Sequence, residues 1–130
     1  MPEEYYLITL EAIDKGLLCG ALLRATAPLT IQAMYKKMRE KFIAGRARWF
    51  DFTNKSALYF DINIKRGKEG KATQLKAKEL GYIYKLDSVV LAFEDDPEIP
   101  YEVVKIGVIT DELDAFKDIT NGTSVKMKLM

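Results

Sequence analysis

The sequence predicts a mainly β protein: a closed or nearly closed barrel of about eight short strands with two helices, formed by residues 1–130 as one domain. Short runs of β-branched and aromatic residues recur between turn-forming clusters, and an amphipathic helical pattern interrupts them. The chain has 130 residues, which fits one domain, and no internal repeat or Pro/Ser-rich linker divides it. Closure of the sheet would also remove the edge strands that invite unwanted pairing.

The first third of the chain predicts a strand hairpin followed by a helix. Residues 5–13 read as a strand, residues 14–16 as a turn, and residues 17–23 as the returning strand. Thr26 is expected to cap the helix, and Pro28 suits its first turn because no N–H is needed there. The apolar face recurs at three- and four-residue steps and comprises Ile31, Met34, Tyr35, Met38 and Phe42.

Strands dominate the remainder of the chain. The expected strands are residues 46–52, 57–64, 75–80, 82–86, 89–93, 101–109 and 125–129. Residues 63–71 place two glycines among several bases and predict an exposed loop, and residues 94–98 predict an acidic loop. Thr110 is expected to cap a short second helix that turns Leu113 and Phe116 inward.

Composition excludes several kinds of site. The sequence holds no histidine, which excludes a Ser-His-Asp triad, a Cys-His pair and a His-ligated metal. Cys19 is the single cysteine, so the chain forms no internal disulfide, and its leucine neighbours favour a reduced core residue. No P-loop or EF-hand spacing occurs. We therefore expect no cofactor and no metal.

The first residues lack the features of a secretory signal. Met1 and Pro2 are followed by the acids Glu3 and Glu4, where a signal peptide carries positive charge and then an apolar run. No apolar stretch approaches the roughly 20 residues that span a bilayer. The sequence therefore predicts a cytoplasmic protein with no membrane partner.

Several spaced residues resemble the cyclophilin-like barrel. Residues 27–30, Ala-Pro-Leu-Thr, are similar to the start of the first cyclophilin helix. The family's closing unit is a strand, a short helix, a Gly turn and a last strand, and the similar residues here are 104–109, Leu113, Phe116, Ile119, Gly122 and Val125. Trp49, residues 58–60 and residues 81–84 resemble the small prokaryotic cyclophilin-like proteins of uncharacterised function.

The resemblance implies a groove for a peptide but not the catalytic signature of true cyclophilins. Those enzymes use an Arg beside Phe, Gln, Trp and His, in runs such as Phe-His-Arg, and none of these runs occurs here. Arg46 or Arg48 lies near the place expected for the catalytic Arg. A shared fold does not carry function across this gap.

One arginine-rich stretch carries the candidate binding residues. On a strand, Arg46, Arg48 and Phe50 share one face and Trp49 lies on the other. Two arginines on one face could hold a carboxylate, a phosphate or a peptide carbonyl. We expect a ligand-binding groove formed by Arg46, Arg48, Trp49 and Tyr59. The alternative is that both arginines are solvated charges and that Trp49 belongs to the core.

The net charge of +1 conceals an uneven distribution. Residues 24–85 hold fifteen Lys or Arg and five Asp or Glu, which gives +10, whereas residues 1–23 carry −3 and residues 86–130 carry −6. Bases interleaved with aromatic residues are typical of surfaces that bind single-stranded nucleic acid. The alternative is that the aromatic residues are core and that acids from both ends of the chain meet the bases in space.

These observations favour binding over catalysis. The leading hypothesis is a cyclophilin-like protein that binds a peptide or a small anionic molecule in a groove, without strong catalysis. The alternatives are a peptidyl-prolyl cis-trans isomerase, a single-stranded nucleic-acid-binding module and a purely structural subunit. The sequence does not decide whether the chain is an enzyme, and it predicts no oligomeric state.

Overall fold

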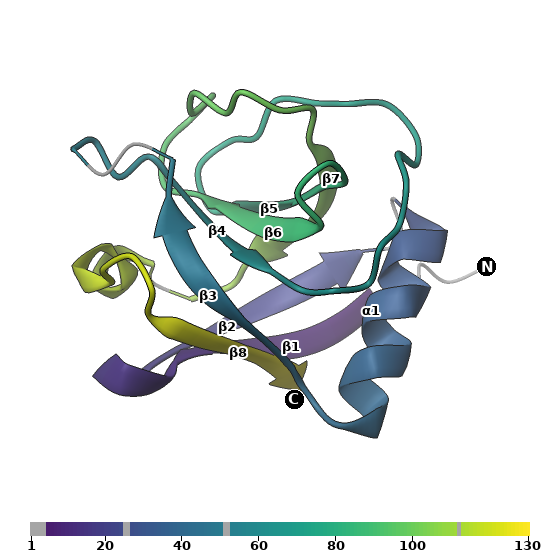
Figure 1. Ribbon diagram of the computed structural model, residues 1–130, viewed down its shortest axis with the longest axis horizontal. Helices are drawn as coiled ribbons and strands as arrows, with labels where there is room; N and C mark the ends of the chain where they lie inside the picture. The colour runs from purple at the N-terminus through teal and green to yellow at the C-terminus, as the bar shows by residue number, and fades with distance from the viewer. Residues whose placement is uncertain (1–4, 25–26, 51–52, 112) are drawn as a thin grey trace.

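Eight antiparallel strands form a closed barrel in the computed structural model, which describes residues 5–24, 27–50, 53–111 and 113–130 (Figure 1). Around the barrel the strands follow the order β1-β2-β7-β5-β6-β4-β3-β8. Their bounds are β1 Tyr5–Ala12, β2 Leu17–Arg24, β3 Ile43–Trp49, β4 Ala57–Asp61, β5 Glu79–Ile83, β6 Ser88–Ala92, β7 Val104–Ile109 and β8 Ser124–Leu129. The predicted fold class, a closed and mainly β barrel, is confirmed.

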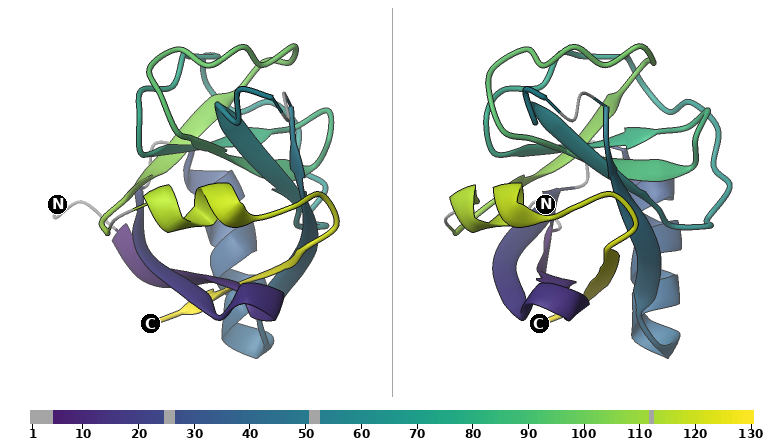
Figure 2. Two further views of the ribbon diagram at one scale, coloured as in Figure 1. Left: turned by 90° about the vertical axis from the view of Figure 1, so that its left-hand side faces the viewer. Right: turned by 60° about the vertical axis from the view of Figure 1, so that its left-hand side comes forward.

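Helical segments cover both mouths of the barrel. The helix α1 (Pro28–Glu40) lies across one mouth, and the 3₁₀-helix η2 (Asp114–Asp118) lies across the other (Figure 2). A further 3₁₀ turn, η1 (Ile13–Lys15), joins β1 to β2. The core inside the barrel takes in side chains from both covers: Ile31, Met34 and Met38 from α1, and Phe116 from η2. None of the described helices is long and apolar enough to cross a membrane.

The second predicted helix is only five residues of 3₁₀-helix, and α1 is the one α-helix in the described part of the chain. The N-cap of η2 is Leu113, which has no capping side chain. The N–H of Thr110, the predicted cap, donates instead to the carbonyl oxygen of Gly20 at 3.0 Å. Thr26, the cap predicted for α1, lies outside the described residues.

Two predicted strands, residues 75–80 and 82–86, are replaced by the single strand β5. The segment just before β5 is not a strand but runs over the outside of the barrel, where Leu75 is buried. The Val103 side chain lies directly against the backbone of Gly81 in β5. A Cβ atom at Gly81 would overlap it, so only a glycine allows this close approach. This close approach lets the loops pack directly on the outer face of the sheet.

A second group of buried apolar side chains therefore lies outside the barrel. Leu75 and Val103, from the loops before β5 and β7, pack on outward-facing side chains of the sheet such as Val90. We call this group the outer cluster; it comprises Ala57, Leu75, Ile83, Val90, Ala92 and Val103, with the half-buried Phe50, Tyr59, Leu86 and Ile99 packed against it. Burial of this apolar surface holds both loops against the barrel.

The loop that follows β4 is fastened to the start of α1 by Glu69. One carboxylate oxygen of Glu69 accepts the N–H of Leu29 at 2.7 Å, and the other accepts the N–H and the hydroxyl of Thr30, both at 2.8 Å. The first turn of α1 contains no acid of its own, and its N-cap, Ala27, has no capping side chain. Glu69 thus supplies, from forty positions away, the acceptor that a helix start needs.

Candidate functional site

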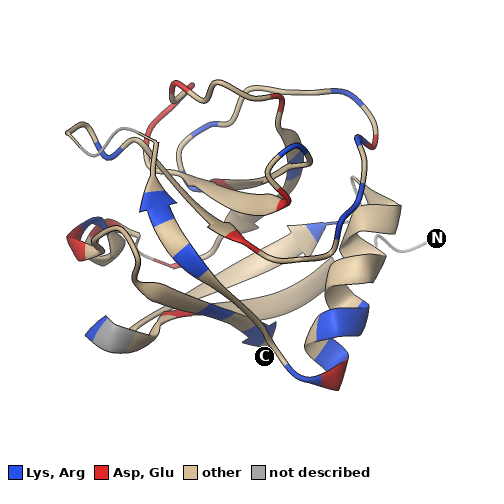
Figure 3. Ribbon diagram, viewed as in Figure 1, with Lys and Arg blue, Asp and Glu red and all other residues tan. Residues whose placement is uncertain are grey.

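Arg46 and Arg48 lie on the outer face of β3, as the alternation along the strand predicts. Both side chains are exposed. Ala47, which lies between them, and Trp49, which follows Arg48, are buried. Arg48 is paired across the sheet with Tyr59 of β4, and the same register sets Arg46 opposite Asp61. Figure 3 shows the two basic positions side by side along β3. The outer face of β3 and β4 therefore presents two cations, one acid and one aromatic ring.

The two arginines border a hollow of about 410 Å³. Its described lining comes from three adjacent strands: Ala44, Gly45, Arg46 and Arg48 of β3, Asp61 of β4 and Ser124 of β8. Gly45 is among its lining residues, and a Cβ atom there would overlap the carbonyl oxygen of Asp61. A glycine at this position is thus needed for the close approach of β3 and β4.

The hydrogen bonds in this hollow leave Arg48 available. The Nη1 of Arg46 donates to the carbonyl oxygen of Gly122 at 3.1 Å, and the backbone N–H of Arg46 donates to Oδ1 of Asp61 at 3.2 Å. Within the described ranges, the side chain of Arg48 makes no hydrogen bond or ion pair. Two guanidinium groups against one carboxylate leave the hollow with a net positive charge.

Trp49 is separated from the other three predicted site residues. Its side chain is 5% exposed and belongs to the core inside the barrel. The indole Nε1 donates to the carbonyl oxygen of Ile119 at 2.7 Å, and the ring lies 5.1 Å from that of Phe93. The structure thus brings Arg46, Arg48 and Tyr59 together on the outer face, and it places Trp49 on the opposite face of β3.

A second hollow, of about 530 Å³, continues the same face past the end of β3. Phe50, Glu98, Ile99 and Pro100 line it among the described residues. Phe50 stacks on Tyr59 with ring centroids 4.2 Å apart, and Tyr101 lies 6.2 Å from Phe50. Strand alternation groups Phe50 with the arginines. Nothing local in the sequence places residues 98–100 there, because they belong to a loop docked on the outer cluster.

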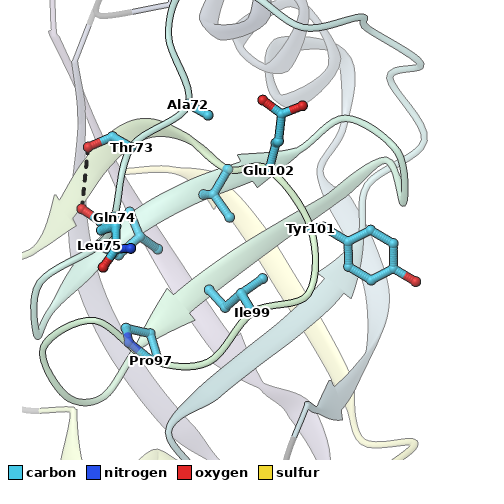
Figure 4. A pocket seen from close by; sticks show the side chains of 9 residues that line it. Ala72, Thr73, Gln74, Leu75, Pro97, Ile99, Tyr101 and Glu102 are labelled. Atoms are coloured by element: carbon cyan, nitrogen blue, oxygen red, sulfur yellow. Dashed lines mark hydrogen bonds between the residues drawn. The ribbon is translucent and has the colours of Figure 1, made fainter.

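A third hollow, of about 340 Å³, lies on the other side of this loop. Its lining residues are Ala72, Thr73, Gln74, Leu75, Pro97, Ile99, Tyr101, Glu102 and Val103 (Figure 4). Figure 4 shows the Tyr101 ring on the side away from Thr73 and Gln74. The carboxylate of Glu102 is held by Lys68 at 2.7 Å and by the Tyr84 hydroxyl at 2.9 Å. Because this acid is already paired, we assign no ligand to this hollow.

Part of the positive charge of the basic central segment, residues 24–85, is balanced by acids close to it. The hydrogen bond from Lys68, followed by that from Tyr84, lowers the pKa of Glu102 below its usual range. Lys37 Nζ donates to the carbonyl oxygen of Ile62 at 2.7 Å. The bases are distributed over α1, β3 and the loop after β4, with acids among them (Figure 3). This distribution does not favour a nucleic-acid partner, and we propose none.

Cys19 has the environment of a core residue. Its side chain is fully buried, and burial raises the pKa of the thiol to about 11, with a further contribution from Asp111. Only the thiolate is a nucleophile, so the protonated thiol is inert at neutral pH.

The fold and these hollows define a class: a small closed antiparallel barrel with a candidate binding face on the outside of β3 and β4. No known protein family matches the chain, and no curated protein sequence matches it. The fold is similar to the solution structure of the hypothetical protein AF2241 from Archaeoglobus fulgidus, with a TM-score of 0.77. That comparison covers 99% of this chain and 98% of the other at 18% sequence identity, which shows a shared fold alone.

Proposed function

We propose that the protein binds an anionic ligand, a peptide or a small molecule, with its carboxylate or phosphate held between Arg46 and Arg48. The observation that supports the proposal is that both guanidinium groups line one hollow of about 410 Å³. Arg guanidinium groups match the geometry of carboxylate and phosphate oxygens and remain charged at all physiological pH values. Ser124, which also lines the hollow, supplies a hydroxyl that can donate to such an anion.

A cyclophilin-like relationship is part of this proposal. The residues that resemble the family, such as Gly107 and Phe116, fall on β7 and η2, in the closing unit of the barrel. The absence of the family's catalytic runs from the sequence supports binding without strong catalysis. The Arg pair then serves as an anchor for the ligand rather than as a catalytic group.

The proposal predicts that inorganic phosphate and acetate bind the wild-type protein weakly and perturb the amide resonances of residues 44–48, 61 and 124 in an NMR titration. Replacing both arginines, R46Q/R48Q, is expected to weaken binding of either anion at least about tenfold, because charge-assisted hydrogen bonds are lost on both sides of the ligand.

The matched control removes two positive charges elsewhere. K36Q/R39Q changes two exposed positions on α1 and alters the net charge by the same amount. It is expected to leave anion binding within about twofold of wild type, because neither side chain lines the hollow and salt screens exposed charges. Equal losses in the two double variants would mean diffuse attraction rather than a site, and the proposal would be wrong.

Prolyl isomerisation is the second candidate, and one observation favours it. The side chain of Arg48, which makes no hydrogen bond or ion pair in the described part of the chain, lies beside the Phe50–Tyr59 stack, so a donor adjoins an apolar surface on which a proline ring could pack. The binding proposal predicts no acceleration in a protease-coupled assay with a proline peptide. A rate above background that R48A abolishes, with the fold intact by circular dichroism, would replace binding by isomerisation as the function.

A further inference from the structure

Three chemically different features follow one another along the outer face of β3. The Arg46–Arg48 hollow comes first, the stacked rings of Phe50 and Tyr59 come next, and the hollow that contains Glu98 comes last. Arg48, which lines the first hollow, is paired across the sheet with Tyr59, and Tyr59 stacks on Phe50, which lines the second hollow, so the rings lie between the two hollows. The face is therefore basic at one end, aromatic in the middle and acidic at the other end.

Glu98 is the acid that a ligand can reach at this far end. The carboxylate is exposed and makes no hydrogen bond or ion pair with any residue in the described part of the chain. Two other acids near it are already engaged, since Oδ1 of Asp95 accepts the N–H of Ala77 at 2.9 Å and Glu102 is held by Lys68, and Glu98 is the acid that lines this hollow. An unpaired carboxylate beside the apolar side chains of Phe50 and Ile99 favours a cation with an apolar stem.

The spacing of these features fits a short extended peptide. Arg46 and Phe50 are four residues apart on one strand, which corresponds to about 13 Å at about 3.3 Å per residue. An extended peptide of five residues has the same four intervals and covers the same length with the same rise. A peptide could thus place a carboxylate at Arg46 and Arg48 while a base four positions away, on the same side of the peptide, lies at the hollow of Glu98.

We propose that the ligand is a peptide segment with opposite charges at its two ends: an acidic group at Arg46 and Arg48, an apolar side chain on Phe50 and Tyr59, and a Lys or Arg at Glu98. This inference rests on the proposed function and adds the class of ligand to it. The complementary order of charges distinguishes such a peptide from phosphate or a simple carboxylate, which would use the first hollow alone.

The test uses the blocked peptide acetyl-Lys-Ala-Phe-Ala-Glu-amide, whose Lys, Phe and Glu side chains share one side of the extended chain, and three relatives in which Lys is replaced by Gln, Phe by Gly, or Glu by Gln. The complete peptide is expected to bind the wild-type protein best, with a loss of about threefold when Lys is removed, as for an exposed ion pair. Removing Phe is expected to cost about tenfold, since an aromatic contact is lost together with its buried area. Isothermal titration calorimetry or NMR gives the affinities.

A double-mutant cycle then ties the peptide lysine to Glu98. In E98Q the Lys and Gln peptides are expected to bind equally, and in E98K a peptide with Glu in place of Lys is expected to bind better than the original. If R46Q/R48Q weakens binding but E98Q and E98K leave the preference for Lys unchanged, the proposed order of charges is wrong and the proposed function stands. If neither the peptides nor phosphate depend on the arginines, both proposals are wrong.

Discussion

Replacing Trp49 with alanine is expected to lower the free energy of unfolding by about 3–5 kcal/mol, the range for removing a large aromatic side chain from a core. The indole is buried inside the barrel, packs against Phe93 and donates to the carbonyl oxygen of Ile119. Its removal leaves a cavity between β3 and the segment after η2, together with a buried carbonyl that has lost its donor. Urea unfolding followed by circular dichroism measures the change, since the variant has no tryptophan left for fluorescence.

Two further variants test separately the hydrogen bond of the Trp49 indole and the orientation of β3. W49F keeps most of the apolar volume and removes the Nε1 donor, so it is expected to cost about 1–3 kcal/mol, as for an unpaired buried acceptor. R48A changes the neighbouring residue on the outer face and is expected to stay within about 0.5 kcal/mol of wild type. A W49A variant as stable as R48A would mean that Trp49 is not a core residue, and the orientation of β3 would be wrong.

The orientation of β3 also shows what strand periodicity could predict. Alternation alone groups Arg46 and Arg48 with Phe50 and sets Trp49 on the other face, and the structure has this arrangement. The expectation that Trp49 shares a groove with the arginines therefore conflicts with the same rule. A large aromatic residue on the same strand face as a buried residue, here Ala47, is most often a core residue.

Long-range packing accounts for what the sequence could not predict. The residues that complete the candidate face, Glu98, Ile99 and Pro100, lie in an irregular loop, and only docking on the outer cluster brings them beside Phe50. β5 likewise begins at Glu79 because the residues before it pack over the barrel instead of pairing within it. Such contacts join residues far apart in the chain, so no short-range pattern records them.

The cap of α1 is the clearest example. At the start of the helix, the N–H groups of Leu29 and Thr30 donate to Glu69, which lies within the loop predicted to be exposed. The loop carries an alternation of bases and glycines that is typical of exposed segments. One acid among the bases gives no signal of its partner, because a cap from a distant residue leaves no motif such as a capping box.

Removing this cap is expected to destabilise the protein by about 1–2 kcal/mol at pH 7, in the variant E69A, since a helix loses its capping acceptor and the loop loses its attachment. Burial raises the pKa of Glu69, but the hydrogen bonds from Leu29 and Thr30 outweigh it, so the pKa lies below its usual range. A carboxyl group with a depressed pKa stabilises the fold fully above its unfolded value of about 4.3, and the contribution is lost as the pH falls below that value.

The difference in stability between wild type and E69A is therefore expected to shrink as the pH falls below the unfolded value of about 4.3 and through the depressed pKa of Glu69, and urea unfolding at a series of pH values measures it. K68A is the matched control, since it removes the neighbouring side chain and only an exposed ion pair with Glu102, which contributes little to stability. Amide hydrogen exchange at Leu29 and Thr30 should accelerate in E69A and not in K68A, because only the first variant frees those two N–H groups. If E69A were as stable as wild type at pH 7, or if its deficit did not shrink at any pH as the solution is acidified, the carboxylate would not be the group that holds the loop to the helix.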